Sequence, residues 1–263
     1  MIKPQKNPGL LVAVAAHADD AELNAGGLMA KWVAHGGRVA LVMVTNNCSG
    51  EILPASGDET CLERRLPAAT TALRHREQAT ASALLGAKVY HLGWPQRHYW
   101  NGRKVVSLDH GTRSKPPPGV EKTPLVIAFR QPPAIKRMGD LLVALKPARV
   151  ITQIPTDLDT EHHATACLVW QAFAANPKKL GRVPLQFWSP GSSCIGGIFD
   201  PGYDVIEDIS DHFEAKLRLC AAHRSQMVHM RWEMVVARAR KWGRRIGVRY
   251  AEPFKTAQKP SLP

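Results

Sequence analysis

The sequence predicts an α/β protein with a mostly parallel sheet between two layers of helices, a three-layer, Rossmann-like arrangement. Short apolar runs alternate along the chain with longer segments in which apolar residues follow helical spacing. At 263 residues the chain could form one large core or two small ones, and no linker clearly separates two domains. We therefore expect a single domain over residues 1–263, with loop insertions near residues 46–66 and 93–133.

The first strand and the first helix are the most clearly marked elements. Leu10–Ala16 is apolar throughout, is too short for a typical helix and follows Pro8-Gly9, which fits a strand buried on both faces. Apolar residues then follow helical spacing over residues 23–33, until Gly36-Gly37 ends the pattern. The basic N-terminus and this apolar run also resemble a short signal peptide, but cleavage there would remove the first strand, so we favour the strand.

The remaining elements repeat this alternation. Further short, mostly apolar runs predict strands at residues 39–45, 88–92, 149–152 and 184–188. Helical spacing predicts helices at residues 68–85, 134–146 and 164–174, the first of them ended by Gly86. Asp211 and Glu214 form a candidate capping box for a helix that begins near His212. Strands that alternate with helices in this way favour a parallel sheet.

Composition limits the class of protein. The five cysteines are scattered and lack CxxC spacing, which is typical of reduced thiols in a cytoplasmic protein (Cys48, Cys61, Cys167, Cys194 and Cys220). No segment approaches the roughly 20 apolar residues that a membrane span requires. The net charge is +13, and residues 216–255 hold eleven Lys and Arg but two Glu. Such a field favours acidic partners, although a solvated basic face that aids solubility is the simpler explanation.

Acidic residues and histidines crowd at two junctions between a predicted strand and a helix. These junctions are His17-Ala18-Asp19-Asp20-Ala21-Glu22 and Thr156-Asp157-Leu158-Asp159-Thr160-Glu161-His162-His163. Ligands of open α/β sheets bind at the carboxyl ends of the strands, and a divalent metal would offset the cost of burying polar groups there. The simpler alternative is that the Asp pair caps a helix and that each histidine is a hydrogen-bonded core residue.

Together, the two junctions resemble the signatures of the PIG-L/LmbE family of zinc-dependent N-deacetylases. Residues 17–22 are similar to the family's His-Pro-Asp-Asp-Glu, with Gly26-Gly27 following, and residues 159–165 are similar to its His-x-Asp-His-x-Ala-Thr. Three weaker similarities extend the match along most of the chain: Arg74-x-x-Glu77, Ala222-His223-Arg224-Ser225-Gln226 and Tyr250-Ala251-Glu252-Pro253-Phe254.

The resemblance implies a zinc site and a reaction. His17, Asp20 and His162 would be the three protein ligands, which leave one position open for water. The residues alone do not choose between Asp19 and Asp20, or between His162 and His163. Zinc would lower the pKa of its water, and Asp19 would take the water proton and later deliver it to the leaving amine. The expected reaction is hydrolysis of an N-acetyl or N-acyl group from an amino-sugar conjugate of the N-acetylglucosamine type.

Three positions depart from the family's pattern. Ala18 replaces a proline, and Gln96 stands where the family often carries an aspartate that contacts the sugar. Asp159 replaces a histidine that is assigned in relatives to transition-state stabilisation, and an ionised aspartate would repel a developing oxyanion. We expect Asp159 to be ionised, to point away from the substrate carbonyl and to hold a neighbouring group such as His163.

Substrate binding is expected at Arg74 and Gln96. The alternative for Arg74 is an exposed ion pair with Glu77, three residues further along a helix. The segment 93–133 is a candidate active-site flap, and its aromatic residues could stack on a sugar ring or anchor the loop to the core (Trp94, Tyr99 and Trp100).

A nucleic-acid or anion-binding protein is the rival class of function. The basic C-terminal segment would explain it, but the acid and histidine clusters would repel phosphate unless a metal intervened. A dehydrogenase fits less well because no G-x-G-x-x-G follows the first strand. We expect a small amino-sugar conjugate, acidic if the basic field steers it, as the partner, with no nucleic acid; a homo-oligomer is compatible with the sequence.

Overall fold

The computed structural model describes residues 7–107, 123–188 and 202–258. Its centre is a seven-stranded sheet in the order β3-β2-β1-β6-β7-β9-β8. The strands are β1 (Leu10–Ala15), β2 (Arg38–Thr45), β3 (Lys88–Trp94), β6 (Arg149–Thr152), β7 (Leu185–Trp188), β8 (Val205–Asp208) and β9 (Ala251–Thr256). The first five of these run parallel, whereas β9 is antiparallel to both of its neighbours.

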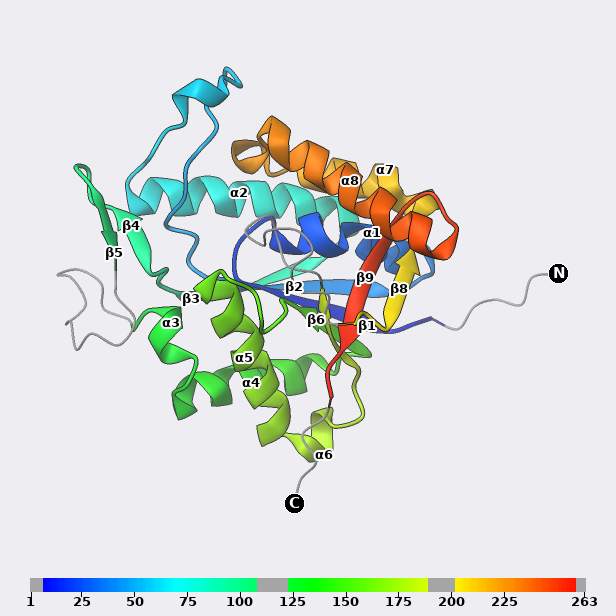
Figure 1. The fold of residues 1–263 in the computed structure, drawn as a ribbon. Coiled ribbons are helices and arrows are strands. Elements are labelled where there is room, and N and C mark those ends of the chain that lie inside the picture. The colour runs from blue at the N-terminus through cyan, green and yellow to red at the C-terminus, as the bar shows by residue number, and fades with distance from the viewer. Residues whose placement is uncertain (1–6, 108–122, 189–201, 259–263) are drawn as a thin grey trace.

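Helices cover both faces of this sheet (Figure 1). One layer holds α1 (Asp20–Ala34), α2 (Pro67–Leu85), α7 (Phe213–Ala221) and α8 (His229–Ile246). The other holds α3 (Leu125–Ala128), α4 (Pro132–Leu145), α5 (Thr160–Ala175) and α6 (Pro177–Leu180). The predicted three-layer α/β fold with a mostly parallel sheet is therefore confirmed.

The central strand β1 is buried on both faces, which explains its uninterrupted apolar run. Val12 and Val14 pack into the cluster that contains residues of α4 and α5. The alternate residues Leu11, Ala13 and Ala15 pack into the cluster that contains residues of α1. Because side chains of a strand alternate between faces, a strand between two helical layers must be apolar at every position.

The predicted strands and helices are present, with boundaries shifted by a few residues. The helix expected near His212 is α7, but its predicted capping box is wrong. Residues Ser210–His212 form a short 3₁₀ turn, and His212, which caps α7, makes no side-chain cap hydrogen bond. Helices α3, α6 and α8 and strands β8 and β9 were not predicted from the sequence.

The two predicted insertions contain small elements of their own. The first carries the 3₁₀ turn Glu59–Cys61, and the second carries the hairpin β4 (His98–Trp100) and β5 (Val105–Ser107). Both stand out at one end of the molecule (Figure 1). Residues 108–122 of the second insertion, including the run Pro116-Pro117-Pro118, lie outside the described residues.

A glycine pair allows α1 to approach α7 and β9 closely. A Cβ atom at Gly27 would lie 2.5 Å from Ile209, and one at Gly26 would lie 3.1 Å from Lys216. At this contact Glu252 accepts hydrogen bonds from the backbone N–H groups of Gly27 (3.0 Å) and Leu28 (2.8 Å). The family-like residues 26–27 and 250–254 therefore meet in one buried contact.

No helix of the described residues is long and apolar enough to cross a membrane. Four cysteines are free thiols in the structure (Cys48, Cys61, Cys167 and Cys220), and Cys194 lies outside the described residues.

Candidate metal and catalytic site

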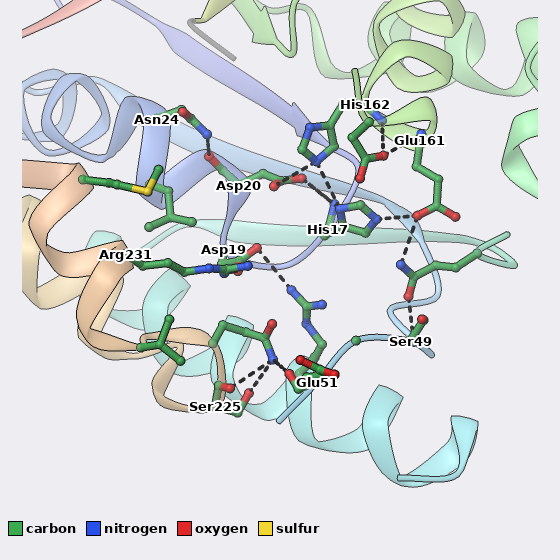
Figure 2. Close-up of a pocket in the computed structure, with 18 of the residues that line it drawn as sticks. His17, Asp19, Asp20, Asn24, Ser49, Glu51, Glu161, His162, Ser225 and Arg231 are labelled. Carbon is green, nitrogen blue, oxygen red and sulfur yellow. Dashed lines mark hydrogen bonds and ion pairs between the residues drawn. The ribbon is translucent and has the colours of Figure 1, made fainter. Parts of the chain in front are cut away.

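The two acid and histidine junctions meet at the carboxyl edge of the sheet. The first follows β1 and the second follows β6, and these strands are parallel neighbours paired from Leu11–Arg149 to Val14–Thr152. The backbone therefore carries both junctions to the same edge, although they lie more than 130 residues apart in sequence. Figure 2 shows their side chains converging on one site.

Three of these side chains place ligand atoms close together. His17 Nδ1 lies 3.2 Å from His162 Nε2. Asp20 completes the group, with Oδ2 3.4 Å from His17 Nδ1 and Oδ1 3.3 Å from His162 Nε2. One ligand atom from each residue lies within 4.8 Å of the other two. The remaining candidates of the two pairs, Asp19 and His163, are not part of this group.

This donor set fits a divalent metal such as zinc. Two imidazoles and one carboxylate are a common catalytic zinc set. Metal–ligand bonds of about 2.0–2.1 Å in tetrahedral geometry separate ligand atoms by roughly 3.3 Å, close to the spacings between His17, Asp20 and His162. The arrangement needs little movement to accept an ion.

The outward nitrogen of each imidazole is held by a further carboxylate. His162 Nδ1 lies 3.0 Å from Asp157 Oδ2, and His17 Nε2 lies 2.7 Å from Glu161 Oε2. Such partners fix the ring orientation and the tautomer that leaves the inner nitrogen free to bind a metal. Asp20 is itself positioned by Gln153 Nε2 at 2.9 Å and by the backbone N–H of His17 at 2.8 Å.

The cluster favours positive charge at its centre. Burial opposes protonation of His17, but hydrogen bonds and charge from Asp20 and Glu161 outweigh it and raise its pKa to about 10. The pKa of His162 is likewise raised despite burial, through Asp20 and Asp157. Burial would raise the pKa of Asp20, yet the two histidines lower it well below its usual value. A divalent cation would supply the charge that these protons otherwise provide.

Asp19 lies beside this group and is held by two arginines. Its backbone adopts a φ of 102°, in the left-handed region that residues other than glycine rarely enter, and its side chain lines the cavity. Arg74 Nη2 lies 3.2 Å from Asp19 Oδ1 and also donates to the carbonyl of Ala18. Arg231 Nη1 lies 2.7 Å from Asp19 Oδ2. The Asp19 carboxylate is therefore fixed beside the candidate metal ligands but is not one of them.

Asp159 caps the helix that carries His162. Its Oδ1 accepts hydrogen bonds from the backbone N–H groups of Glu161 (2.8 Å) and His162 (3.3 Å). Burial would raise its pKa, but the charges of His17 and His162 and the helix N–H lower it. The neighbouring His163 is held by another group, since its Nδ1 lies 2.6 Å from the carbonyl oxygen of Pro155.

Arg74 and Gln96 both line the site but are engaged by the protein. Gln96 donates to Glu161 (3.1 Å) and accepts from the backbone N–H of Ser49 (2.8 Å). The alternative of an exposed ion pair between Arg74 and Glu77 is wrong. Arg74 is buried against Asp19, while Glu77 accepts from the backbone and the hydroxyl of Ser225, each at 2.7 Å.

The site opens into a cavity of about 540 Å³. Its inner end is formed by the two junctions, and one wall is formed by the start of α8, with Met230, Arg231, Met234 and Arg238. Of the aromatic residues in the second insertion, Trp94 packs in the core. Tyr99 and Trp100 line a smaller neighbouring cavity instead.

A second buried charge pair lies behind the site. His223 Nε2 is 3.4 Å from Glu22, and Gln78 donates to the same carboxylate at 2.8 Å. Burial opposes the charge on His223, but Glu22 raises its pKa. His223 does not line the cavity. Within the family-like residues 222–226, its contact is with the buried carboxylate of Glu22 in the first junction.

Several site residues were not singled out from the sequence. Asp157 and Glu161 stood in the second junction without an assigned role, and Gln153 directly follows β6. Their place after a strand was a usable signal. Arg231 gave no such signal, because its position beside Asp19 depends on how α8 packs against the other helices of its layer.

The fold and this cluster define a three-layer α/β protein with a candidate divalent-metal centre at the carboxyl edge of its sheet. A family model described as GlcNAc-PI de-N-acetylase, PIG-L, matches residues 12–173. The chain therefore belongs to the PIG-L family. The matched residues include both junctions but end before α7, α8 and β9.

Solved structures with the same fold have different activities in their names. An N,N'-diacetylchitobiose deacetylase from Pyrococcus horikoshii is 21% identical, with a TM-score of 0.65 over 96% of this chain and 86% of that one. The zinc-inhibited form of the teicoplanin deacetylase Orf2 is 18% identical, with a TM-score of 0.64 over 95% and 99%. GalB, a 4-carboxy-2-hydroxymuconate hydratase from Pseudomonas putida KT2440, is 18% identical, with a TM-score of 0.68 over 97% and 98%. At these identities the likeness establishes the fold.

Proposed function

We propose that the protein is a zinc-dependent N-deacetylase that removes an N-acetyl or N-acyl group from an amino-sugar conjugate of the N-acetylglucosamine type. The observation that carries this proposal is the ligand group of His17, Asp20 and His162, with Asp19 held beside it. Membership of the PIG-L family supports hydrolytic deacetylation. The names of the chitobiose and teicoplanin deacetylases support a sugar conjugate as the substrate class.

His17, Asp20 and His162 would hold the metal, and Asp157 and Glu161 would keep both imidazoles in the ligating tautomer. When bound, zinc supplies a Lewis acid for the amide carbonyl and a water of lowered pKa. All other steps fall to residues of the chain.

Asp19 is the proposed general base and acid. Its carboxylate takes a proton from the attacking water and delivers it to the nitrogen of the breaking amide bond, so that a carboxylate and a free amine leave. Arg74 and Arg231 fix its orientation from two sides. Preorganised groups of this kind lower the cost of reaching the transition state.

Asp159 would act on the site through the helix, not on the substrate oxygen. Its cap holds the N–H groups of Glu161 and His162 and so fixes the start of α5. With an aspartate in place of the family's histidine, the metal would carry most of the oxyanion stabilisation. We therefore expect slower turnover than in relatives that keep the histidine.

Arg74 and Gln96 remain the proposed substrate-binding residues. Both line the cavity, and the buried guanidinium of Arg74 has donors beyond those used by Asp19 and Ala18. Gln96 would act mainly by holding Glu161 and the loop at Ser49 against the bound sugar.

The test is amine release. Purified protein, loaded with zinc and in parallel with cobalt or manganese, is incubated with a panel of N-acetylglucosamine conjugates, and free amine is measured. We expect release from at least one conjugate, with Asp19→Asn as the inactive control that keeps its metal. A fully metal-loaded protein that releases no amine from any of them would contradict the proposal.

The alternative is a basic nucleic-acid or anion-binding protein. Its support is the exposed basic surface at the end of α8, formed by Arg240, Lys241, Arg244 and Arg245. Salt-sensitive binding of DNA or RNA by the metal-free protein, with no amine release, would favour it.

The free thiols support a cytoplasmic location, and we propose residues 1–263 as one catalytic domain.

A further inference from the structure

Arg231 lines the cavity and joins the proposed base to its outer wall. It lies in the first turn of α8, and its guanidinium extends alongside Asp19 (Figure 2). Its side chain is 29% exposed, whereas that of Asp19 is 4% exposed, so the pair runs from the buried inner end toward the opening. The pair is short, with 2.7 Å between Nη1 and Oδ2.

The two arginines that hold Asp19 are not equivalent. The side chain of Arg74 is 6% exposed and binds both Asp19 and the carbonyl of Ala18, so it is part of the buried frame. The guanidinium of Arg231 has Asp19 as its only hydrogen-bond or ion-pair partner among the residues that the structure describes. A guanidinium carries five N–H donors, and one of them makes this contact. The rest of the group lies on the cavity wall.

Carboxylates line the inner end of the cavity, but the side chains nearer Arg231 on α8 are apolar or basic and favour a bound anion. Met230 and Met234 flank it on the cavity wall, and Arg97 and Arg238 line the same cavity. The carboxylate of Glu51 at the opening is already paired with Arg64 at 2.6 Å. Apolar neighbours weaken the competition from water for a charge-assisted hydrogen bond.

We propose that Arg231 is a specificity-determining residue, which binds an anionic group of the substrate, a carboxylate or a phosphate ester, while the same guanidinium holds Asp19. This inference rests on the proposed function and narrows its substrate class to acidic amino-sugar conjugates. A guanidinium suits both tasks, because its N–H groups point outward along different edges. One edge can bind Asp19 while another binds a second oxyanion. The residue lies outside the part of the chain matched by the family model.

The test separates binding from turnover. Calorimetry measures the affinity of the zinc-loaded protein for N-acetylglucosamine, N-acetylglucosamine 6-phosphate and N-acetylmuramic acid, which carry no anion, a phosphate and a carboxylate. The variants are Arg231→Gln and, as the matched control, Arg240→Gln, an exposed arginine of the same helix. Metal content and thermal stability are checked in both variants.

We expect at least one acidic ligand to bind the wild type about ten- to a hundredfold more tightly than the neutral sugar, the range of a charge-assisted hydrogen bond. Arg231→Gln should remove most of that preference and leave binding of the neutral sugar nearly unchanged, whereas Arg240→Gln should keep it. Whichever acidic ligand the wild type prefers over the neutral sugar identifies the anion as a phosphate or a carboxylate.

Three results would overturn the inference: no preference in the wild type, an unchanged preference in Arg231→Gln, or equal losses in the two variants, which would indicate the general basic field. Turnover adds a further distinction. If Arg231 only positioned Asp19, Arg231→Gln would lower kcat equally for acidic and neutral substrates without raising KM for the acidic one. Absence of amine release with an intact binding preference would contradict the proposed function and leave this inference standing.

Discussion

Asp157→Asn should weaken metal binding although Asp157 is not a proposed ligand. Its Oδ2 lies 3.0 Å from His162 Nδ1, and its Oδ1 accepts from the backbone N–H of Asp159, also at 3.0 Å. The side chain is 1% exposed, so water cannot replace a lost partner. An amide keeps one acceptor oxygen and cannot satisfy both contacts.

The expected loss follows from the tautomer of His162. If the new NH₂ group faces Nδ1, the imidazole must carry its proton on Nε2, the nitrogen that would bind the metal. Loss of such an outer partner typically lowers metal affinity about 10–100-fold, which corresponds to about 1.4–2.7 kcal/mol. We expect Asp157→Asn to fall within this range.

The assay is competition for zinc with a chromophoric chelator at neutral pH. Asp140→Asn is the matched control, because Asp140 is an exposed carboxylate on α4 that pairs with Lys136. The control should bind zinc as the wild type does. Wild-type affinity in Asp157→Asn would refute the argument that this carboxylate sets the tautomer.

Three further outcomes are expected. Asp19→Asn should keep its metal but lose about 10²–10⁴-fold in turnover, since an amide cannot accept the water proton; near-normal amine release would remove Asp19 from the mechanism. Lys216→Met should lower the free energy of unfolding by about 3–5 kcal/mol, measured by chemical denaturation, because Lys216 and Glu252 are both 3% exposed and 2.5 Å apart. An effect no larger than that of a surface ion pair would show that backbone N–H groups alone satisfy Glu252. Asp159→Ala should lower the free energy of unfolding, measured in the same way, by about 0.5–2 kcal/mol through the lost helix cap, and Asp159→Asn should lower it much less. Equal losses in the two variants would contradict the capping role.

The sheet and the convergence of the two junctions could be predicted because their signals are local. The uninterrupted apolar run of β1 marks a strand buried on both faces, and the polar residues after it mark the carboxyl end. Once β1 and β6 are parallel neighbours, His17 and His162 must lie at one edge. The choice of Asp20 over Asp19 came from the family resemblance. In the structure Asp20 lies against both histidines, whereas Asp19 is held by two arginines.

The C-terminal part of the site could not be predicted in the same way. Residues 229–246 do follow helical spacing, with Val235, Ala239 and Trp242 buried on one face of α8, so the helix itself carried a sequence signal that was missed. Arg231 reaches Asp19 only because α8 packs over the first layer of helices, a long-range contact that no local spacing records. The capping box at Asp211 was wrong because the chain forms a 3₁₀ turn before α7.

Metal content tests the central claim most directly. Zinc is measured by elemental analysis in the wild type, His162→Ala and His163→Ala after identical metal loading and desalting. The two variants remove the same group from adjacent residues of α5, but His163 faces the carbonyl of Pro155 and the ring of Phe129. We predict about one zinc per chain in the wild type and in His163→Ala, and a sharp loss in His162→Ala. Retention of zinc by His162→Ala together with its loss from His163→Ala would contradict the proposed metal site.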